Sequence, residues 1–169
     1  MKKELKYCNY IQEIISNNIE FINFFILFSR FECCLKREQY NKWEGKAEAN
    51  WGCFWKLNKD KIIKDIIKSS DSKIKTSVNY LFMNQPDKQF INSSWWIYWN
   101  SKSIEAFNPH WLINIINTIR NNLFHWGKYN DGPCIWAERN KELLEHWIII
   151  LEELVKIDPK IKSNFYCFE

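Results

Sequence analysis

Apolar side chains recur every three or four positions along most of this chain, the spacing that places them on one face of an α-helix. The longest such pattern spans residues 4–38 and predicts a long helix, which can break near Asn17 and Asn18. Its apolar face is wide, as expected for a helix near the centre of a bundle. Residues 39–50 are polar and contain Gly45, so we expect a loop to follow this helix.

The middle of the chain joins short helical patterns through polar connections. A short aromatic segment at residues 51–57 precedes a basic amphipathic helix at residues 60–68. Ser70 and Asp71 can cap the next helix, because their side-chain oxygens accept hydrogen bonds from the N–H groups of a first turn. That helix should stop at Pro86, whose ring cannot continue it.

The last part of the chain predicts two further long helices. Residues 89–100 are rich in tryptophan and predict a loop before them. Pro109 suits the first turn of a strongly apolar helix that should end around Gly127. A turn at residues 130–133 then leads to the last long helix, at residues 138–156.

The composition agrees with a helical fold. Only four glycines and four prolines leave few breakers, and a hydrophobic fraction of 46% is too high for a disordered chain. The sequence shows no repeat and no low-complexity linker. We therefore expect residues 1–169 to form a single all-α domain, a helical bundle of about five helices.

Charge and targeting signals narrow the class of protein only slightly. The net charge of +4 allows a polyanion such as RNA as a partner but does not argue for one. No basic-then-apolar leader opens the chain, and the apolar run at residues 21–28 is too short to span a bilayer. We expect a cytoplasmic protein that does not enter a membrane.

Cysteine, histidine and tryptophan are interpreted first as packing residues. The six cysteines show no C-x-x-C spacing, which favours reduced structural thiols. The three histidines are scattered singly, so we expect no metal site and no other cofactor. The ten tryptophans can stack on bases, but their positions favour the core or an interface.

The candidate chemistry lies at the end of the apolar helix, in the run R-N-N-L-F-H at residues 120–125. Arg120 offers a permanent planar cation that can hold two phosphate oxygens. His125 can take or give a proton near neutral pH. A phosphate-binding cation beside a proton-transfer group is what RNA cleavage without a metal requires.

Helical geometry favours a dimer for this chemistry. Asn121 and His125 are four positions apart and share a face, whereas Arg120 lies about 140° from His125 around the axis. A loosened backbone at Trp126 and Gly127 would let one helix present both groups. Alternatively, two copies that meet across a two-fold axis would each supply Arg120 and His125 to one shared cleft.

Two blocks of the sequence resemble a known family. The run R-N-N-L-F-H-x-G-K resembles the R-x(4–6)-H signature of HEPN domains. F-S-R-F-E at residues 28–32, followed by Leu35 and Lys36, resembles a stretch in the first long helix of such proteins. With the trailing helix at residues 137–157, the resemblance covers most of the chain.

The resemblance implies a homodimeric, metal-independent endoribonuclease, either a bacterial toxin or an antiviral defence effector. RNA would be the substrate, and an antitoxin or defence-system protein would be a further partner. Arg120, Asn121 and His125 would be catalytic: Arg120 stabilises charge on the phosphate, His125 acts as acid or base, and Asn121 orients the histidine or the phosphate. The products would be a 2′,3′-cyclic phosphate and a 5′-hydroxyl.

Four further residues are candidates for supporting roles. Glu32 matches the acidic position of the second block, and it either pairs with Arg120 or His125 or faces solvent. Asn122 belongs to the motif as a second supporting residue. The last two candidates, which would contact phosphate or stack on a base, are Lys128 and Tyr129.

Other interpretations stay open on the sequence alone. Some HEPN toxins carry a tyrosine two positions after the histidine, where a partner enzyme modifies it, but this chain has Gly127 there. Arg120 and His125 can also be a surface cation and a helix cap, which the helix dipole would favour. The alternative function is a catalytically inactive HEPN-like module that binds a partner protein or a nucleotide. His110 and His146 match no motif and are expected to be structural or surface residues.

Overall fold

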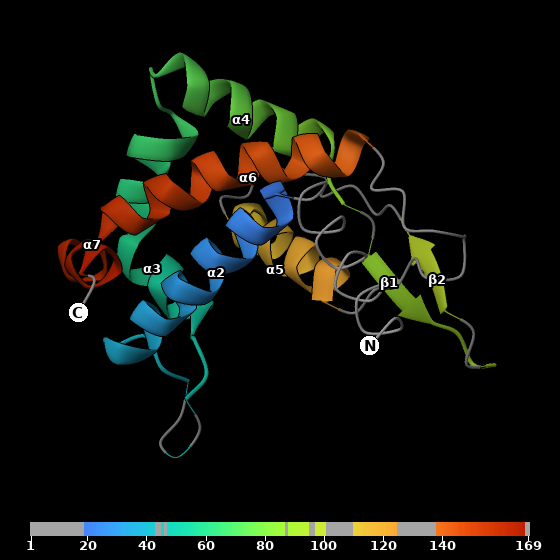
Figure 1. Cartoon of the computed structure of the whole chain (residues 1–169), viewed down its shortest axis with the longest axis horizontal. Coiled ribbons are helices and arrows are strands. Elements are labelled where there is room, and N and C mark those ends of the chain that lie inside the picture. Colours follow the sequence, from blue (N-terminus) through green and yellow to red (C-terminus); the bar gives the residue numbers. More distant parts are fainter. Residues whose placement is uncertain are drawn as a thin grey trace, which may run out of the picture.

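The expected all-α bundle is confirmed, and a small hairpin is added to it (Figure 1). The computed structural model describes residues 19–42, 45, 47–86, 88–94, 97–100, 110–124 and 138–167. Within these ranges the α-helices are α2 (Ile19–Arg37), α3 (Trp51–Ile62), α4 (Ser72–Met83), α5 (Trp111–Phe124), α6 (Glu138–Ile157) and α7 (Pro159–Tyr166). A π-helical turn, η1 (Ile63–Ile67), continues α3, and strands β1 (Lys88–Ile91) and β2 (Ile97–Asn100) pair antiparallel.

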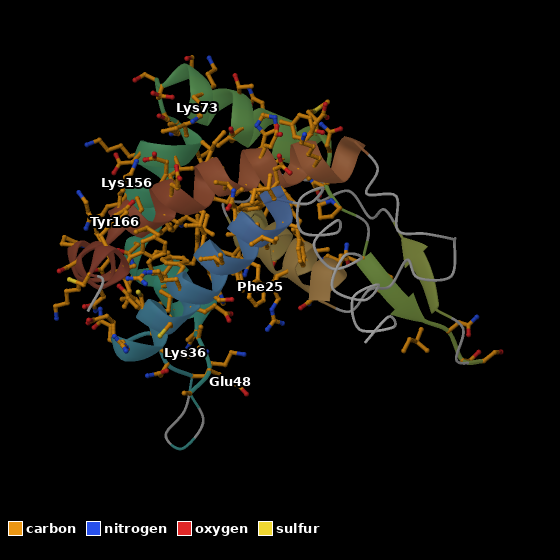
Figure 2. The ribbon with its side chains drawn as sticks, in the orientation of Figure 1. Phe25, Lys36, Glu48, Lys73, Lys156 and Tyr166 are labelled. Carbon is orange, nitrogen blue, oxygen red and sulfur yellow. The ribbon has the colours of Figure 1, made fainter. Side chains whose placement is uncertain are left out.

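Helix α6 organises the bundle. It packs along α2 on one side and along α4 on the other, while the short α7 turns back against both α2 and α6 (Figure 1). Exposed side chains surround the helices, such as Lys73 on α4 and Tyr166 on α7 (Figure 2). None of the described helices is long and apolar enough to cross a membrane.

Helix α5 contributes many buried side chains to the core. Trp111, Leu112, Ile113, Ile115, Ile116 and Ile119 are all buried. These positions occupy more than one face of the helix, as expected for a helix that other elements surround. Other helices complete the core with large rings, among them Trp147 of α6 and Phe28 of α2.

The two segments expected at residues 51–57 and 60–68 are one continuous element. Asn50 begins it, because its side-chain oxygen accepts a hydrogen bond of 2.9 Å from the N–H of Cys53. No proline or glycine interrupts residues 53–68, so α3 runs on into η1. The N–H of Lys68 ends the element by donating to the carbonyl of Ile63 at 2.8 Å.

The prediction of a loop at residues 89–100 was wrong, because most of this segment forms the hairpin. Its strands carry β-branched and aromatic residues, which pack well on a pleated surface. The register pairs Phe90 with Tyr98 and Ile91 with Ile97. At the turn, the side-chain oxygen of Asn92 accepts from the N–H of Ser94 at 2.9 Å, a local bond typical of asparagine in turns.

The remaining helix boundaries were mostly predicted. Asp71 caps α4 by accepting from two N–H groups of the first turn, and α6 coincides with the helix expected at residues 138–156. Helix α7 was missed, although Asp158 followed by Pro159 is a start signal that the sequence contains. The expected break near Asn17 and Asn18 lies outside the described residues.

Candidate active site at the end of α5

Helix α5 is anchored at its N-terminal end by aromatic contacts. His110 meets the ring of Trp55 edge-on at 6.3 Å between centroids, which ties this end to α3. Trp111 meets Phe82 of α4 edge-on at 5.5 Å. The C-terminal end of α5, which carries Arg120, lies beside β1 (Figure 1). The bundle therefore holds the apolar end of the helix and leaves the polar end at its border.

Arg120 and Asn121 are brought together by the structure. Nη1 of Arg120 donates a hydrogen bond of 3.0 Å to Oδ1 of Asn121. Arg120 is half-buried and Asn121 is exposed, while the preceding Ile119 is in the core. The guanidinium is thus held by its neighbour at the point where the helix leaves the core.

The other residues of the motif divide into two groups. Asn122 is half-buried in the last turn of α5. His125, Lys128 and Tyr129 lie outside the described residues. The structure therefore places the cation and the amide of the candidate site, and the proton-transfer role of His125 stays a prediction.

Glu32 supports the contact between α2 and α3. Its Oε1 accepts a hydrogen bond of 3.1 Å from Nε1 of Trp51. The Trp51 ring also stacks on Phe28, with 5.5 Å between centroids. Among the described ion pairs, none joins Glu32 to Arg120. Of the alternatives for Glu32, the structure shows a half-buried carboxylate that holds an indole N–H.

The two phenylalanines and the arginine of the F-S-R-F-E block have packing roles. Phe28 and Phe31 are fully buried between α2 and α3. Arg30 donates to the carbonyls of Phe165 and Cys167, and its guanidinium carbon lies 5.6 Å from the centre of the Phe165 ring. Because the last carbonyls of a helix lack intrahelical donors, Arg30 acts as a cap for the C-terminal end of α7.

A serine, a histidine and a tyrosine meet between α4 and α6, and no sequence motif indicated this cluster. Nδ1 of His146 lies 3.1 Å from Oγ of Ser77, and the ring of Tyr80 lies 4.2 Å from the histidine ring. The Tyr80 hydroxyl donates to Glu142 at 2.6 Å. Burial lowers the pKa of His146, and the carboxylates of Glu142 and Glu145 offset this only partly.

Which groups donate and which accept the hydrogen bonds decides whether this cluster can act as a catalytic serine and histidine. The Ser77 hydroxyl donates to the carbonyl of Lys73 at 2.9 Å, so its oxygen accepts from Nδ1–H of a neutral His146. A nucleophilic serine would need the opposite arrangement, in which the histidine accepts the hydroxyl proton. Ser77 is also only 1% exposed. The cluster therefore joins two helices, which agrees with the structural role expected for His146.

The described cysteines form no disulfide, and they range from buried to exposed. Cys33, Cys34, Cys53 and Cys167 are all free thiols. Cys34 is buried, and burial raises its pKa, which keeps the thiol protonated. No three His, Cys, Asp or Glu side chains gather into a possible metal site within the part of the chain that the structure describes.

The chain matches no protein-family model, no curated protein and no solved structure. The functional interpretation therefore depends on the residues of this chain and on the resemblance of its two sequence blocks.

Proposed function

We propose that this chain is a metal-independent endoribonuclease of the HEPN type that acts as a homodimer. The observation that supports this most is the pairing of Arg120 with Asn121 at the border of the core. A guanidinium held in this way can face two phosphate oxygens without losing its own support. In the sequence, His125 follows four residues after Asn121.

The proposed reaction needs only groups of the protein and of the RNA. A base removes the proton of a ribose 2′-hydroxyl, whose oxygen attacks the adjacent phosphorus. Arg120 stabilises the negative charge that develops on the phosphorane oxygens. The bond to the 5′-oxygen breaks, and an acid protonates that oxygen. His125 supplies one of the two proton transfers, and Asn121 orients the guanidinium.

The biological setting that suits this activity is a bacterial toxin or an antiviral defence effector in the cytoplasm. An enzyme that cuts RNA must be restrained until it is needed. An antitoxin or another defence-system protein is therefore the partner that we propose beside RNA. The resemblance to HEPN domains supports this setting.

A cleavage assay with a matched variant tests the proposal. Purified protein should cut a 5′-labelled single-stranded RNA in the presence of EDTA and leave 2′,3′-cyclic phosphate ends. His125→Ala should slow this cleavage by about 10²- to 10⁴-fold, the usual effect of removing a general acid–base group. Circular dichroism should show an unchanged helical content in the variant. A DNA of the same sequence should survive, because it lacks the 2′-hydroxyl.

The opposite results would favour the second candidate, a catalytically inactive module. Its supporting observation is that Arg120 already has a hydrogen-bond partner within its own chain, as a structural arginine would. Cleavage that is equal in wild type and His125→Ala would reveal a contaminating nuclease. Absence of cleavage with every RNA tested would contradict the proposed enzyme.

A further inference from the structure

The hairpin of β1 and β2 is the element that lies beside the polar end of α5. Strand β1 contacts α5, and the hairpin extends from the helical bundle at that side (Figure 1). It is an addition to a helical fold, because the described core contains no residue of the hairpin and comes almost entirely from the helices. RNA bound at the C-terminal end of α5 would therefore lie near this hairpin.

The exposed side chains of β1 offer both a ring and a cation. Phe90 is 36% exposed and Ile91 is 61% exposed, which is high for large apolar residues. Lys88, two positions before Phe90, is also exposed. Successive side chains of a strand point to opposite faces, so Lys88 and Phe90 lie on the same face.

We propose that this face of the hairpin binds single-stranded RNA, with the Phe90 ring stacked on a base and Lys88 beside a phosphate. This inference rests on the proposed function and extends it, because it adds a base-binding surface to the site at Arg120. Aromatic rings stack on every base, so the surface selects unpaired nucleotides rather than a particular sequence.

The chemistry of the surface favours this occupant over duplex RNA or a protein. Bases inside a duplex are already stacked on each other and offer no face to a side chain. A purely apolar partner would leave Lys88 beside an uncharged surface, whereas a polynucleotide presents a phosphate for every base. The cation on the same face and the proximity of Arg120 both point to a polyanion with aromatic groups.

Binding measurements on the full chain can test the surface without any cleavage. The probe is a short fluorescein-labelled single-stranded RNA with 2′-O-methyl groups, which has no free 2′-hydroxyl to attack. Phe90→Leu keeps apolar bulk and removes the ring, and it should weaken binding by about 5- to 100-fold in fluorescence anisotropy. Phe90→Trp keeps a ring and should bind at least as tightly as wild type.

The controls separate a loss of stacking from a loss of structure. Leu57→Ala removes a different exposed apolar side chain, 58% exposed on α3, and should leave affinity unchanged. Lys88→Ala should weaken binding and reduce its dependence on salt, because one phosphate contact fewer releases fewer counterions. The same RNA annealed to its complement should bind more weakly than the single strand.

The outcomes distinguish this inference from the proposed function. Equal affinity of wild type and Phe90→Leu would overturn the hairpin surface even if the protein cuts RNA. Equal binding of the single strand and the duplex would overturn it as well. Affinity that depends on Phe90 in a protein that cuts no RNA would support the surface and contradict the nuclease.

Discussion

Arg120 is the only charged residue in the sequence of α5, and two different physical effects favour a cation there. The carbonyl groups at the C-terminal end of a helix carry partial negative charge, which stabilises a nearby positive side chain. The proposed reaction also needs a cation that spreads over two phosphate oxygens. Charge alone serves the first effect, whereas the second depends on the planar shape of the guanidinium.

Arg120→Lys separates these two roles. Lysine keeps the charge, so the variant should fold normally and bind RNA nearly as well as wild type. It loses the planar fork and the bond to Asn121, so cleavage should fall by about 10²-fold or more, as expected when transition-state charge is no longer stabilised. Single-turnover cleavage rates and thermal unfolding check both expectations. A rate close to that of wild type would show that Arg120 serves only the helix.

The side-chain contacts of the candidate residues were not predicted from the sequence. Asn121 was expected to orient the histidine or the phosphate, whereas in the structure its side-chain oxygen accepts a hydrogen bond from Arg120. Glu32 was expected to pair with a charged residue or to face solvent, but its partner is Trp51, which no local pattern indicates. The link between His146 and Ser77 spans two helices and is equally invisible in the sequence.

At the scale of elements, one carboxylate fixes the start of α7. Oδ1 of Asp158 accepts from the N–H of Lys160 at 2.8 Å and from that of Ile161 at 3.4 Å. Its Oδ2 accepts a hydrogen bond of 2.6 Å from the hydroxyl of Tyr40, which in turn accepts from Asn58 at 3.1 Å. The cap therefore ties α7 to α3 and to the segment after α2.

Asp158→Ala should destabilise the fold by about 1–2 kcal/mol at neutral pH, because it removes an N-cap and leaves the Tyr40 hydroxyl without its acceptor. Asp71→Ala is the matched control, since Asp71 caps α4 through the same kind of bonds to Lys73 and Ile74 but lies exposed. Urea unfolding should show the smaller loss for Asp71→Ala. Equal losses would mean that the Tyr40 contact contributes nothing.

The same carboxylate should make part of this stability depend on pH. Burial would raise the pKa of Asp158, but the hydrogen bonds from Tyr40, Lys160 and Ile161 outweigh it and hold the pKa below its ordinary value. The folded protein therefore binds this proton less readily than the unfolded chain. The stability is present above the ordinary aspartate pKa and is lost as the pH falls below about 4. The difference between wild type and Asp158→Ala should shrink over that range.

Elements with strong local signals were predicted, and elements that depend on their neighbours were not. Helix α4 has an aspartate cap and α6 a long apolar period, so both were evident. The hairpin was missed because a short aromatic run without strict alternation suits a loop as well as a strand. Helix α7 is short, and an isolated helix of that length is only marginally stable. It therefore depends on its N-terminal cap and on the hydrogen bonds from Arg30.

At the scale of the whole molecule, the described surface keeps several large apolar side chains in contact with solvent. On α2, Ile19 is 48%, Phe25 40% and Ile26 54% exposed, and on β1 Ile91 is 61% exposed. Single exposed apolar residues are common in monomers, but clusters of them are typical of interfaces.

The shared-cleft hypothesis predicts a dimer in which the α5 ends of two copies meet. Sedimentation velocity at micromolar concentration should show a dimer, and a monomer there would contradict the hypothesis. Mixing gives a sharper result, because a heterodimer of Arg120→Lys and His125→Ala keeps one intact arginine and one intact histidine in the common cleft. Each variant alone should be nearly inactive, and the mixture should recover RNA cleavage after subunit exchange. If each subunit worked alone, the mixture would stay as inactive as its parts, since no chain in it carries both groups.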